Sequence, residues 1–332
     1  MNNSVQTKRL ISQAGFFILF VLAPPLDLFR LDLTLGHFII FGQDWTLGLD
    51  QFAAGQISAG QAALNIFLRA FLPIGSVIAF VLWISWKYGR LYCGWLCPHF
   101  SVVETVNAVM RRAIGKFSLW DKEKLPQRNP DGSVITPDRR YWLLVLPLAF
   151  AFALLWAVTL LTYLLPPQEI YHNLWNGVLT RNQAFFIGFG TLAFFVEFTL
   201  ARHLFCRFGC AVGLFQSLAW MANKKALVVG FNRAKAGFCY GCNIACDNVC
   251  PMRLNPRTIK RHMFSCTECG QCIAACEQVQ INNPDGSLLK WVEDDCALSK
   301  SDRNFGHRPV VPAHCFESDN NTILIPVVWK NT

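Results

Sequence analysis

The sequence predicts an α-helical membrane protein, in which four transmembrane helices, arranged as a duplicated hairpin, carry a small α+β domain on the cytoplasmic side. Three observations lead to this fold class. Of the 332 residues, 53% are hydrophobic and only 15% are charged, which is too apolar for a soluble chain. The apolar residues gather into four long runs. Eight of the fourteen cysteines gather into one later stretch, which suits metal binding in a reducing compartment.

The first two apolar runs predict the first hairpin. The run from Leu10 to Phe29 follows two basic residues, as in a signal peptide, but no small-x-small cleavage site follows it. We therefore expect an uncleaved span whose N-terminus lies inside. Residues 30–62 predict an outer loop, with a short strand or re-entrant segment at residues 37–41. The second span covers about Asn65 to Trp86, where aromatic and basic residues mark the inner membrane boundary.

The next two apolar runs predict the second hairpin. The third span extends from about Tyr141 to Leu165, where two prolines end it. Residues 168–182 are expected to form a short outer loop, and the fourth span covers about Ala184 to Phe205. The loop between the hairpins, Lys87 to Arg140, holds ten Lys or Arg residues, whereas each outer loop holds one. The positive-inside rule therefore places both termini in the cytoplasm of a multi-pass protein of the bacterial inner membrane.

The clearest motif lies between Cys239 and Cys276, where eight cysteines fall within 38 residues in two runs of the bacterial ferredoxin type. Thiolate sulfur holds iron–sulfur clusters, each cubane needs four ligands, and in two-cluster ferredoxins the fourth cysteine of each run ligates the other cluster. The spacing therefore predicts two 4Fe–4S clusters in a cytoplasmic ferredoxin-like domain. One cluster is assigned to Cys239, Cys242, Cys246 and Cys276, and the other to Cys266, Cys269, Cys272 and Cys250.

Other interpretations of these cysteines are weaker. Zinc ribbons separate their Cys-x-x-Cys pairs by longer gaps, and disulfides need an oxidising compartment. The first run departs from the standard pattern, because three residues rather than two lie between Cys242 and Cys246.

The domains expected are a membrane domain at 1–236, a two-cluster domain at 237–280 and a cytoplasmic tail at 281–332, with a strand at residues 323–329.

Each hairpin is followed by a Cys-x-x-x-Cys pair and an apolar stretch that ends in two basic residues. The pairs are Cys93 with Cys97, and Cys206 with Cys210. Counted from the second cysteine of each pair, Arg111 and Lys224 both lie fourteen residues on, which indicates an internal repeat. Val102, Val103, Val106 and Val109 recur at helical spacing and predict a helix on the inner membrane surface.

The geometry of these pairs allows two interpretations. Cysteines four apart share one face of a helix, but Pro98 favours a break after Cys97 and a new helix that begins at the proline. If the hairpins pack with twofold pseudosymmetry, the four thiols converge near the cytoplasmic face. They could hold a third iron–sulfur centre, bind copper or iron transiently, or form a redox-active dithiol. The alternative is that they are buried small hydrophobes; two pairs at matched positions favour a function.

Several other polar residues are weaker candidates. Glu197 is an acid within the fourth span, where it could be functional or could make a helix-packing hydrogen bond. His99 and His203 adjoin the cysteine pairs and could assist metal binding or be ordinary interfacial histidines. Four tail residues could form a zinc site, although their spacing matches no ribbon or finger. They are Cys296, His307, His314 and Cys315.

The order of motifs resembles that of the membrane polyferredoxins, most closely the FixG/RdxA/CcoG-type cytochrome oxidase accessory proteins. The resemblance covers residues 10–280 and rests on the segments 37–42, 90–98, 206–217 and 239–277. It implies clusters that face the cytoplasm and a role in reducing copper for assembly of a haem–copper oxidase. NapH-like quinol dehydrogenase subunits share this core. The chain departs from the family in its tail and in having Ala211 where a proline would follow the second pair.

Three functions are therefore expected as alternatives. In the first, a cytoplasmic donor reduces the two clusters, and the four membrane-face cysteines take up Cu(II) and release Cu(I), which soft thiolate favours. In the second, the protein relays electrons between a membrane quinone and a reductase partner. In the third, it is a redox sensor or assembly scaffold. An outer acceptor would lie across about 30 Å of hydrocarbon, so an acceptor at the inner face is preferred.

The partners expected are the membrane, a cytoplasmic donor and oxidase assembly factors or a reductase; no nucleic-acid module is present.

Overall fold

The structure is a computed structural model that describes residues 3–116, 136–240, 242, 244–283, 286–301 and 315–316. Within these residues, four helical stretches are long and apolar enough to cross a membrane, as the sequence predicts. They include α1 (Asn3–Leu22), α4 (Leu72–Tyr88), α7 (Trp142–Thr162) and α9 (Arg181–Val196). The second stretch begins earlier than expected, because α3 (Ala59–Ile66) continues through the π-helical turn η1 (Phe67–Phe71) into α4.

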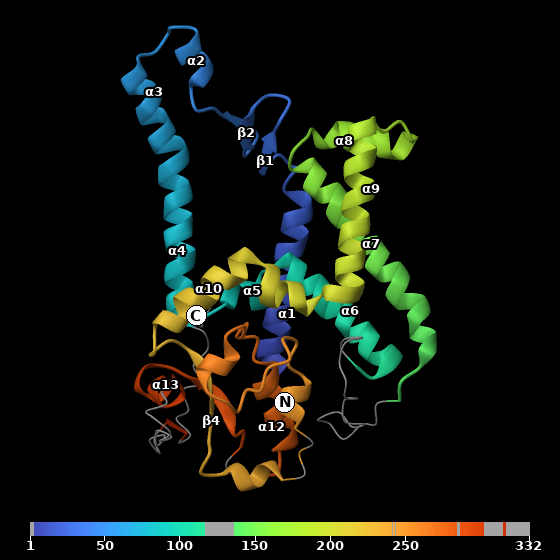
Figure 1. The fold of residues 1–332 in the computed structure, drawn as a ribbon, viewed down its shortest axis with the longest axis vertical. Coiled ribbons are helices and arrows are strands. Elements are labelled where there is room, and N and C mark those ends of the chain that lie inside the picture. The colour runs from blue at the N-terminus through green and yellow to red at the C-terminus, as the bar shows by residue number, and fades with distance from the viewer. Residues whose placement is uncertain are drawn as a thin grey trace.

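The helices α7 and α9 lie side by side, whereas α4 stands apart from them (Figure 1). Ala157 on α7 faces Gly190 on α9, where a Cβ would lie 3.2 Å from the alanine methyl, so a small residue allows this close approach. None of the apolar window in the α3–α4 stretch is buried. Its exposed apolar side chains, such as Phe80 and Ile78, suit a lipid-facing helix.

The outer loops contain more structure than the sequence predicts. Residues 30–62 include an antiparallel sheet of β1 (Phe29–Asp32), β2 (His37–Ile40) and β3 (Gln43–Trp45), followed by α2 (Leu49–Ala53). The strand expected at residues 37–41 is therefore present. The expected loop at 168–182 is wrong in part, because α8 (Pro167–Asn176) occupies most of it. Pro167 stands in the first turn, where its fixed φ favours a helix, and Gly177 ends it with φ 69°.

Both Cys-x-x-x-Cys pairs stand at the junction of two helical elements. Cys93 lies in α5 (Leu91–Trp95), and Cys97 is the N-cap of α6 (Pro98–Ile114). Cys206 lies in the π-helical turn η4 (Phe205–Gly209), and Cys210 is the N-cap of α10 (Ala211–Ala222). The break that Pro98 predicts is confirmed, so neither pair lies along a single continuous helix. The second break occurs without a proline.

The cysteine-rich unit lies at the opposite end of the molecule from α2 and α8 (Figure 1). Its two strands, β4 (Val228–Phe231) and β5 (Leu289–Val292), pair antiparallel and flank the cysteine stretch in sequence. Between them lie two α-helices, the one-turn α11 (Ala245–Asn248) and the longer α12 (Gln271–Val279), and two 3₁₀ turns, η5 (Ala236–Cys239) and η6 (Lys260–Met263). The unit thus has the expected α+β character, and it draws on residues on both sides of 237–280.

The tail continues as α13 (Asp294–Ser301), which packs near β4. Cys296 in this helix forms a disulfide with Cys315. A zinc site that uses both thiols is therefore wrong for this state of the chain. His307, His314 and the strand expected at 323–329 lie outside the described residues.

Candidate functional site

Two cavities in the cysteine-rich unit gather the eight ferredoxin-type cysteines in the predicted sets. The first, with about 300 Å³ of empty space, is lined by Cys239, Cys242, Cys246 and Cys276. The second, with about 380 Å³, is lined by Cys250, Cys266, Cys269 and Cys272. Each set therefore includes one cysteine from the other run, as the crossed ferredoxin pattern requires.

One helix connects the two cavities. Helix α12 carries Cys272 into the second cavity and Cys276 into the first. These residues are four apart, so they lie one above the other on one face of the helix. Cys246 and Cys272 also share a small core with Val229, Ile273 and Leu289. The cavities are thus neighbours, separated by packed apolar side chains.

The extra residue of the first cysteine run is accommodated by an unusual backbone conformation. Ile244 precedes α11 with φ 52° and ψ 41°, in the left-handed region. A β-branched residue rarely adopts this conformation, which costs about 1–3 kcal/mol. Cys246 is nevertheless buried at the cavity, so the turn at Ile244 absorbs the extra residue.

The chemistry of the second cavity fits a thiolate-bound cluster. Burial raises the pKa of the Cys250 thiol to about 12 and also raises the pKa of Cys272. Such thiols ionise only where cations compensate their charge, as iron does. The backbone N–H of Leu254 already donates to Cys250 Sγ at 3.3 Å, which is a contact typical of cluster ligands. Among the described residues, no three or more His, Cys, Asp or Glu side chains lie close enough together to hold a single metal ion. A 4Fe–4S cluster is larger than a single ion, so its four cysteine ligands lie farther apart.

Charged side chains are buried next to the second cavity. Glu268, between Cys266 and Cys269, is fully buried, and burial raises its pKa to about 7. Lys260 donates to the carbonyl oxygens of Trp220 and Asn223 at 2.9 and 2.6 Å, and burial lowers its pKa to about 8. The protein surroundings, rather than water, therefore determine the charge of Glu268 and of Lys260.

The loop that carries Cys266 and Cys269 packs directly on the first Cys-x-x-x-Cys pair. A Cβ on Gly94 would lie 2.0 Å from the carbonyl oxygen of Thr267, so only glycine allows this approach. The indole N–H of Trp95 donates to the carbonyl oxygen of Glu268 at 3.1 Å. The loop that lines the second cavity therefore lies against the turn between Cys93 and Cys97, whereas the first cavity lies farther along α12, at Cys276.

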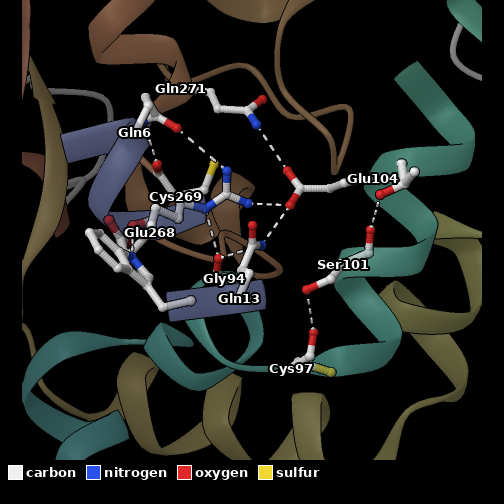
Figure 2. Close-up of polar contacts among 12 residues, drawn as sticks. Gln6, Gln13, Gly94, Cys97, Ser101, Glu104, Glu268, Cys269 and Gln271 are labelled. Carbon is white, nitrogen blue, oxygen red and sulfur yellow. Dashed lines mark hydrogen bonds and ion pairs between the residues drawn. The ribbon is translucent and has the colours of Figure 1, made fainter. Parts of the chain in front are cut away.

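A polar network from α1 fastens this junction (Figure 2). Arg9 donates to the carbonyl oxygen of Gly94 at 2.7 Å and forms a buried ion pair with Glu104 of α6. Gln271 donates to the other oxygen of Glu104 at 2.9 Å, and Gln6 donates to the carbonyl oxygen of Cys269 at 3.0 Å. The network joins α1, α5, α6 and the start of α12, and the sequence reasoning did not identify it.

The thiols of Cys93, Cys97, Cys206 and Cys210, called the membrane-face thiols, form a second group of cysteines. Cys93 and Cys206 are buried, and Cys97 and Cys210 are half-buried. Burial is the main cause that raises the pKa of Cys97 to about 12, and the Cys93 and Cys210 thiols contribute to the rise. Cys206 likewise interacts electrostatically with the other three. The structure therefore brings both pairs together, as the predicted convergence requires.

His99 and Glu197 form a pair beside these thiols. His99 Nε2 lies 3.2 Å from Glu197 Oε1, and the histidine ring packs against Trp156, Phe198 and Phe205. The expected alternative for Glu197, a hydrogen bond between helices, is thus present. Glu197 also interacts electrostatically with Cys206, so the pair adjoins the thiols.

Comparisons with known proteins point to the same segments. A family model described as a 4Fe-4S binding domain matches the chain twice, over residues 69–116 and 182–227. Each match contains one Cys-x-x-x-Cys pair, and neither reaches Cys239. The chain therefore carries a 4Fe-4S binding domain, and the matches add weight to the thiols that the ferredoxin spacing leaves out.

Two relatives are informative. The chain is 27% identical over 277 residues to an uncharacterized protein of Methanocaldococcus jannaschii, covering 83% of this chain and 94% of that protein. It is 25% identical over 236 residues to the ferredoxin-type protein NapH of Haemophilus influenzae, covering 67% and 71%. No solved structure matches. The chain is thus similar to NapH and carries a 4Fe-4S domain, whereas the FixG/RdxA/CcoG type stays a prediction.

Proposed function

We propose that this protein is a membrane-anchored iron–sulfur electron-transfer protein. It takes electrons from a cytoplasmic donor, passes them through two 4Fe–4S clusters, and delivers them to an acceptor at the membrane face. The observation that carries the proposal is the gathering of eight cysteines into two four-thiol cavities, one of which abuts Cys93 and Cys97. When bound, the clusters supply one-electron transfer. The chain supplies the ligands, excludes water with apolar walls and fixes the cavities against the membrane-face thiols.

The first candidate acceptor is Cu(II). Four thiols meet next to the second cavity, and soft thiolate ligands favour Cu(I) over Cu(II). One electron converts Cu(II) to Cu(I), so the reaction balances with one electron from the relay and no atom transfer. This activity would serve copper delivery to a haem–copper oxidase, with oxidase assembly factors as partners. In the proposed topology all these thiols lie on the inner side of the bacterial inner membrane.

The second candidate acceptor or donor is a membrane quinone. The observation that favours it is the pair of His99 and Glu197 within an aromatic surround at the inner end of α9. Quinone reduction takes up protons together with electrons, and a histidine–carboxylate pair is suited to exchange them. A redox sensor or assembly scaffold is the remaining alternative and predicts no acceptor of either kind.

The test is anaerobic purification with iron and sulfide counts, followed by mixing of the reduced protein with Cu(II) or with a quinone analogue. Two cubanes predict about eight iron atoms per chain from the ferredoxin-type cysteines. Reoxidation of the clusters by Cu(II), seen as recovery of their absorbance and lost when all four membrane-face cysteines become serine, supports the copper reaction. Reoxidation by the quinone analogue alone, lost in Glu197→Gln, supports quinone as the acceptor instead of copper. No reoxidation by either contradicts electron delivery at this face.

A further inference from the structure

The large apolar side chains that the cysteine-rich unit leaves exposed all lie at its first cavity. Among the described residues that follow α10, these side chains are Phe238, Tyr240, Ile244 and Ile281, which we call the apolar rim. Tyr240 is 98% exposed and Ile281 73% exposed. Each of the four is next in sequence to a residue that lines the first cavity, namely Cys239, Ala245 or Gln280. The apolar side chains that line the second cavity, such as Met252, are by contrast buried.

Hydrogen bonds hold the segments of the apolar rim around one cavity. The side-chain amide of Gln280 donates to the carbonyl oxygen of Phe238 at 2.8 Å, so the end of α12 lies against η5. The backbone N–H of Cys242 donates to the carbonyl oxygen of Cys239 at 3.3 Å, and that of Ala245 donates to Cys242 at 3.2 Å. These turns connect η5 to α11, so the four apolar side chains belong to a single surface.

The apolar rim carries two features that are unfavourable in a free surface. Exposed apolar side chains gathered in one place are typical of interaction sites. Ile244 is exposed and also takes the left-handed conformation with φ 52°, which is costly for a β-branched residue. Strain of this kind gathers at functional sites. Both features therefore indicate that a partner binds here.

Basic residues lie next to the apolar rim. Residues 232–262 include six Lys or Arg residues and one acid, Asp247. Arg257 lines the first cavity and pairs with Asp247 at 2.9 Å, so this carboxylate is already neutralised. Lys235 is the N-cap of η5, whereas Glu277 beside Cys276 adds one negative charge. The excess of positive charge favours a partner with surface carboxylates.

The apolar rim is also placed where a soluble protein can reach it. Helix α12 begins at Gln271, whose side chain donates to Glu104 of α6. Its nine residues extend for about 13 Å at 1.5 Å per residue, so Ile281 lies beyond the end of α12 that is farther from this contact. The whole unit lies at the opposite end of the molecule from α8 (Figure 1).

We propose that the apolar rim and the basic residues beside it are the docking surface for a small soluble one-electron carrier protein, whose surface carboxylates surround its redox centre. This inference deepens the proposed function and rests on it for the direction of electron flow. One electron passes from the reduced carrier to the oxidised cluster of the first cavity, so the carrier is oxidised, the cluster is reduced and no atom is transferred. The apolar side chains exclude water from the contact, and the basic residues orient the carrier, in the manner of small and transient redox complexes.

The test follows reduction of the anaerobic, cluster-loaded protein in detergent by either of two reductants. One is an acidic plant-type 2Fe–2S ferredoxin, and the other is methyl viologen, a small molecule that needs no docking surface. The variants are Tyr240→Ala and Lys235→Glu. Their matched controls at the other end of the molecule are Trp175→Ala in α8, where the indole is 92% exposed, and Arg181→Glu at the start of α9.

We expect Tyr240→Ala to slow reduction by ferredoxin about tenfold, because aromatic anchors supply much of the free energy of such contacts. Lys235→Glu should slow it at low salt, and the difference should disappear in about 1 M salt, where the Debye length is about 3 Å. Reduction by methyl viologen should not slow in either variant, and both controls should behave as the parent does.

Several results would overturn the docking surface. They are a parent that methyl viologen reduces but ferredoxin does not, equal ferredoxin rates for the parent and Tyr240→Ala, and equal slowing with both reductants, which would mean that the change acts on the cluster itself. Ferredoxin reduction that is lost in phosphatidylcholine nanodiscs would assign the surface to lipid. A parent dimer that Tyr240→Ala dissociates would assign it to a second copy of the chain. Ferredoxin reduction that depends on Tyr240, without reoxidation by Cu(II) or quinone, supports the surface and contradicts only the proposed delivery at the membrane face.

Discussion

Gly94→Ala is the sharpest perturbation that the junction offers. The new Cβ would lie 2.0 Å from the carbonyl oxygen of Thr267, whereas ordinary contacts begin at 3.4 Å. The Cys266–Cys269 loop and the Cys93 turn must therefore separate by about 1.4 Å, the difference between these two distances. Overpacking of this kind costs about 1–3 kcal/mol of folding free energy. Electron delivery should slow as well, because electron transfer becomes slower as the distance between the two centres increases.

The assay mixes the anaerobically reduced protein with the acceptor in a stopped-flow instrument and follows cluster absorbance, with thermal unfolding measured in parallel. Gly188→Ala is the matched control, since a Cβ there meets no atom within 4 Å. We expect Gly94→Ala to keep its iron content but to reoxidise more slowly than the control. A Gly94→Ala protein with the parent's reoxidation rate and melting temperature would refute the direct contact between the second cavity and the Cys93 turn.

Three further predictions concern stability. Arg9→Gln breaks the largely buried ion pair with Glu104 and should cost about 1–3 kcal/mol of folding free energy, because the carboxylate loses a charged hydrogen-bond donor; Arg9→Lys should recover part of this, and equal melting temperatures for all three proteins would contradict it. Burial lowers the pKa of Lys260 from 10.5 to about 8 in the folded protein. Between these two pH values the unfolded chain binds more protons than the folded chain, so the free energy of unfolding rises with pH. Lys260→Met should flatten this rise, which melting temperatures measured from about pH 7 to 10 would show. Ile244→Gly relieves a left-handed β-branched residue and should raise the melting temperature, whereas a decrease would contradict strain there.

The sequence predicted the parts of this protein that follow from local patterns. Hydropathy located the four helical stretches that, among the described residues, are long and apolar enough to cross a membrane, because about 30 Å of hydrocarbon sets the length required. Cysteine spacing gave the two sets of four, because ligand geometry restricts which thiols can share a cluster. Pro98 gave the start of α6, because proline favours the first turn of a helix. Each of these signals lies within a few tens of residues.

The contacts between distant segments could not be predicted in this way. The bond from Gln6 to the carbonyl oxygen of Cys269 spans 263 positions, and the approach of Gly94 to Thr267 depends on how two units pack. Arg90 follows an apolar run, where a basic residue is typical of the membrane boundary, and the sequence does not show that its guanidinium packs against Gly213 of α10. The family model matches both Cys-x-x-x-Cys segments, which adds to the signal that their matched spacing already gives.

The arrangement of the two cavities gives the proposed relay a direction. The loop that lines the second cavity packs on the Cys93 turn, and the carbonyl oxygens of Glu268 and Cys269 accept hydrogen bonds from Trp95 of α5 and Gln6 of α1. The first cavity has no such cover among the described residues near it: Tyr240, between Cys239 and Cys242, is 98% exposed. A soluble donor can approach only where a cavity reaches the surface. In the proposed relay, electrons would therefore enter at the Cys239–Cys276 cavity, pass along α12 from Cys276 to Cys272, and leave from the cavity whose loop packs on the Cys93 turn.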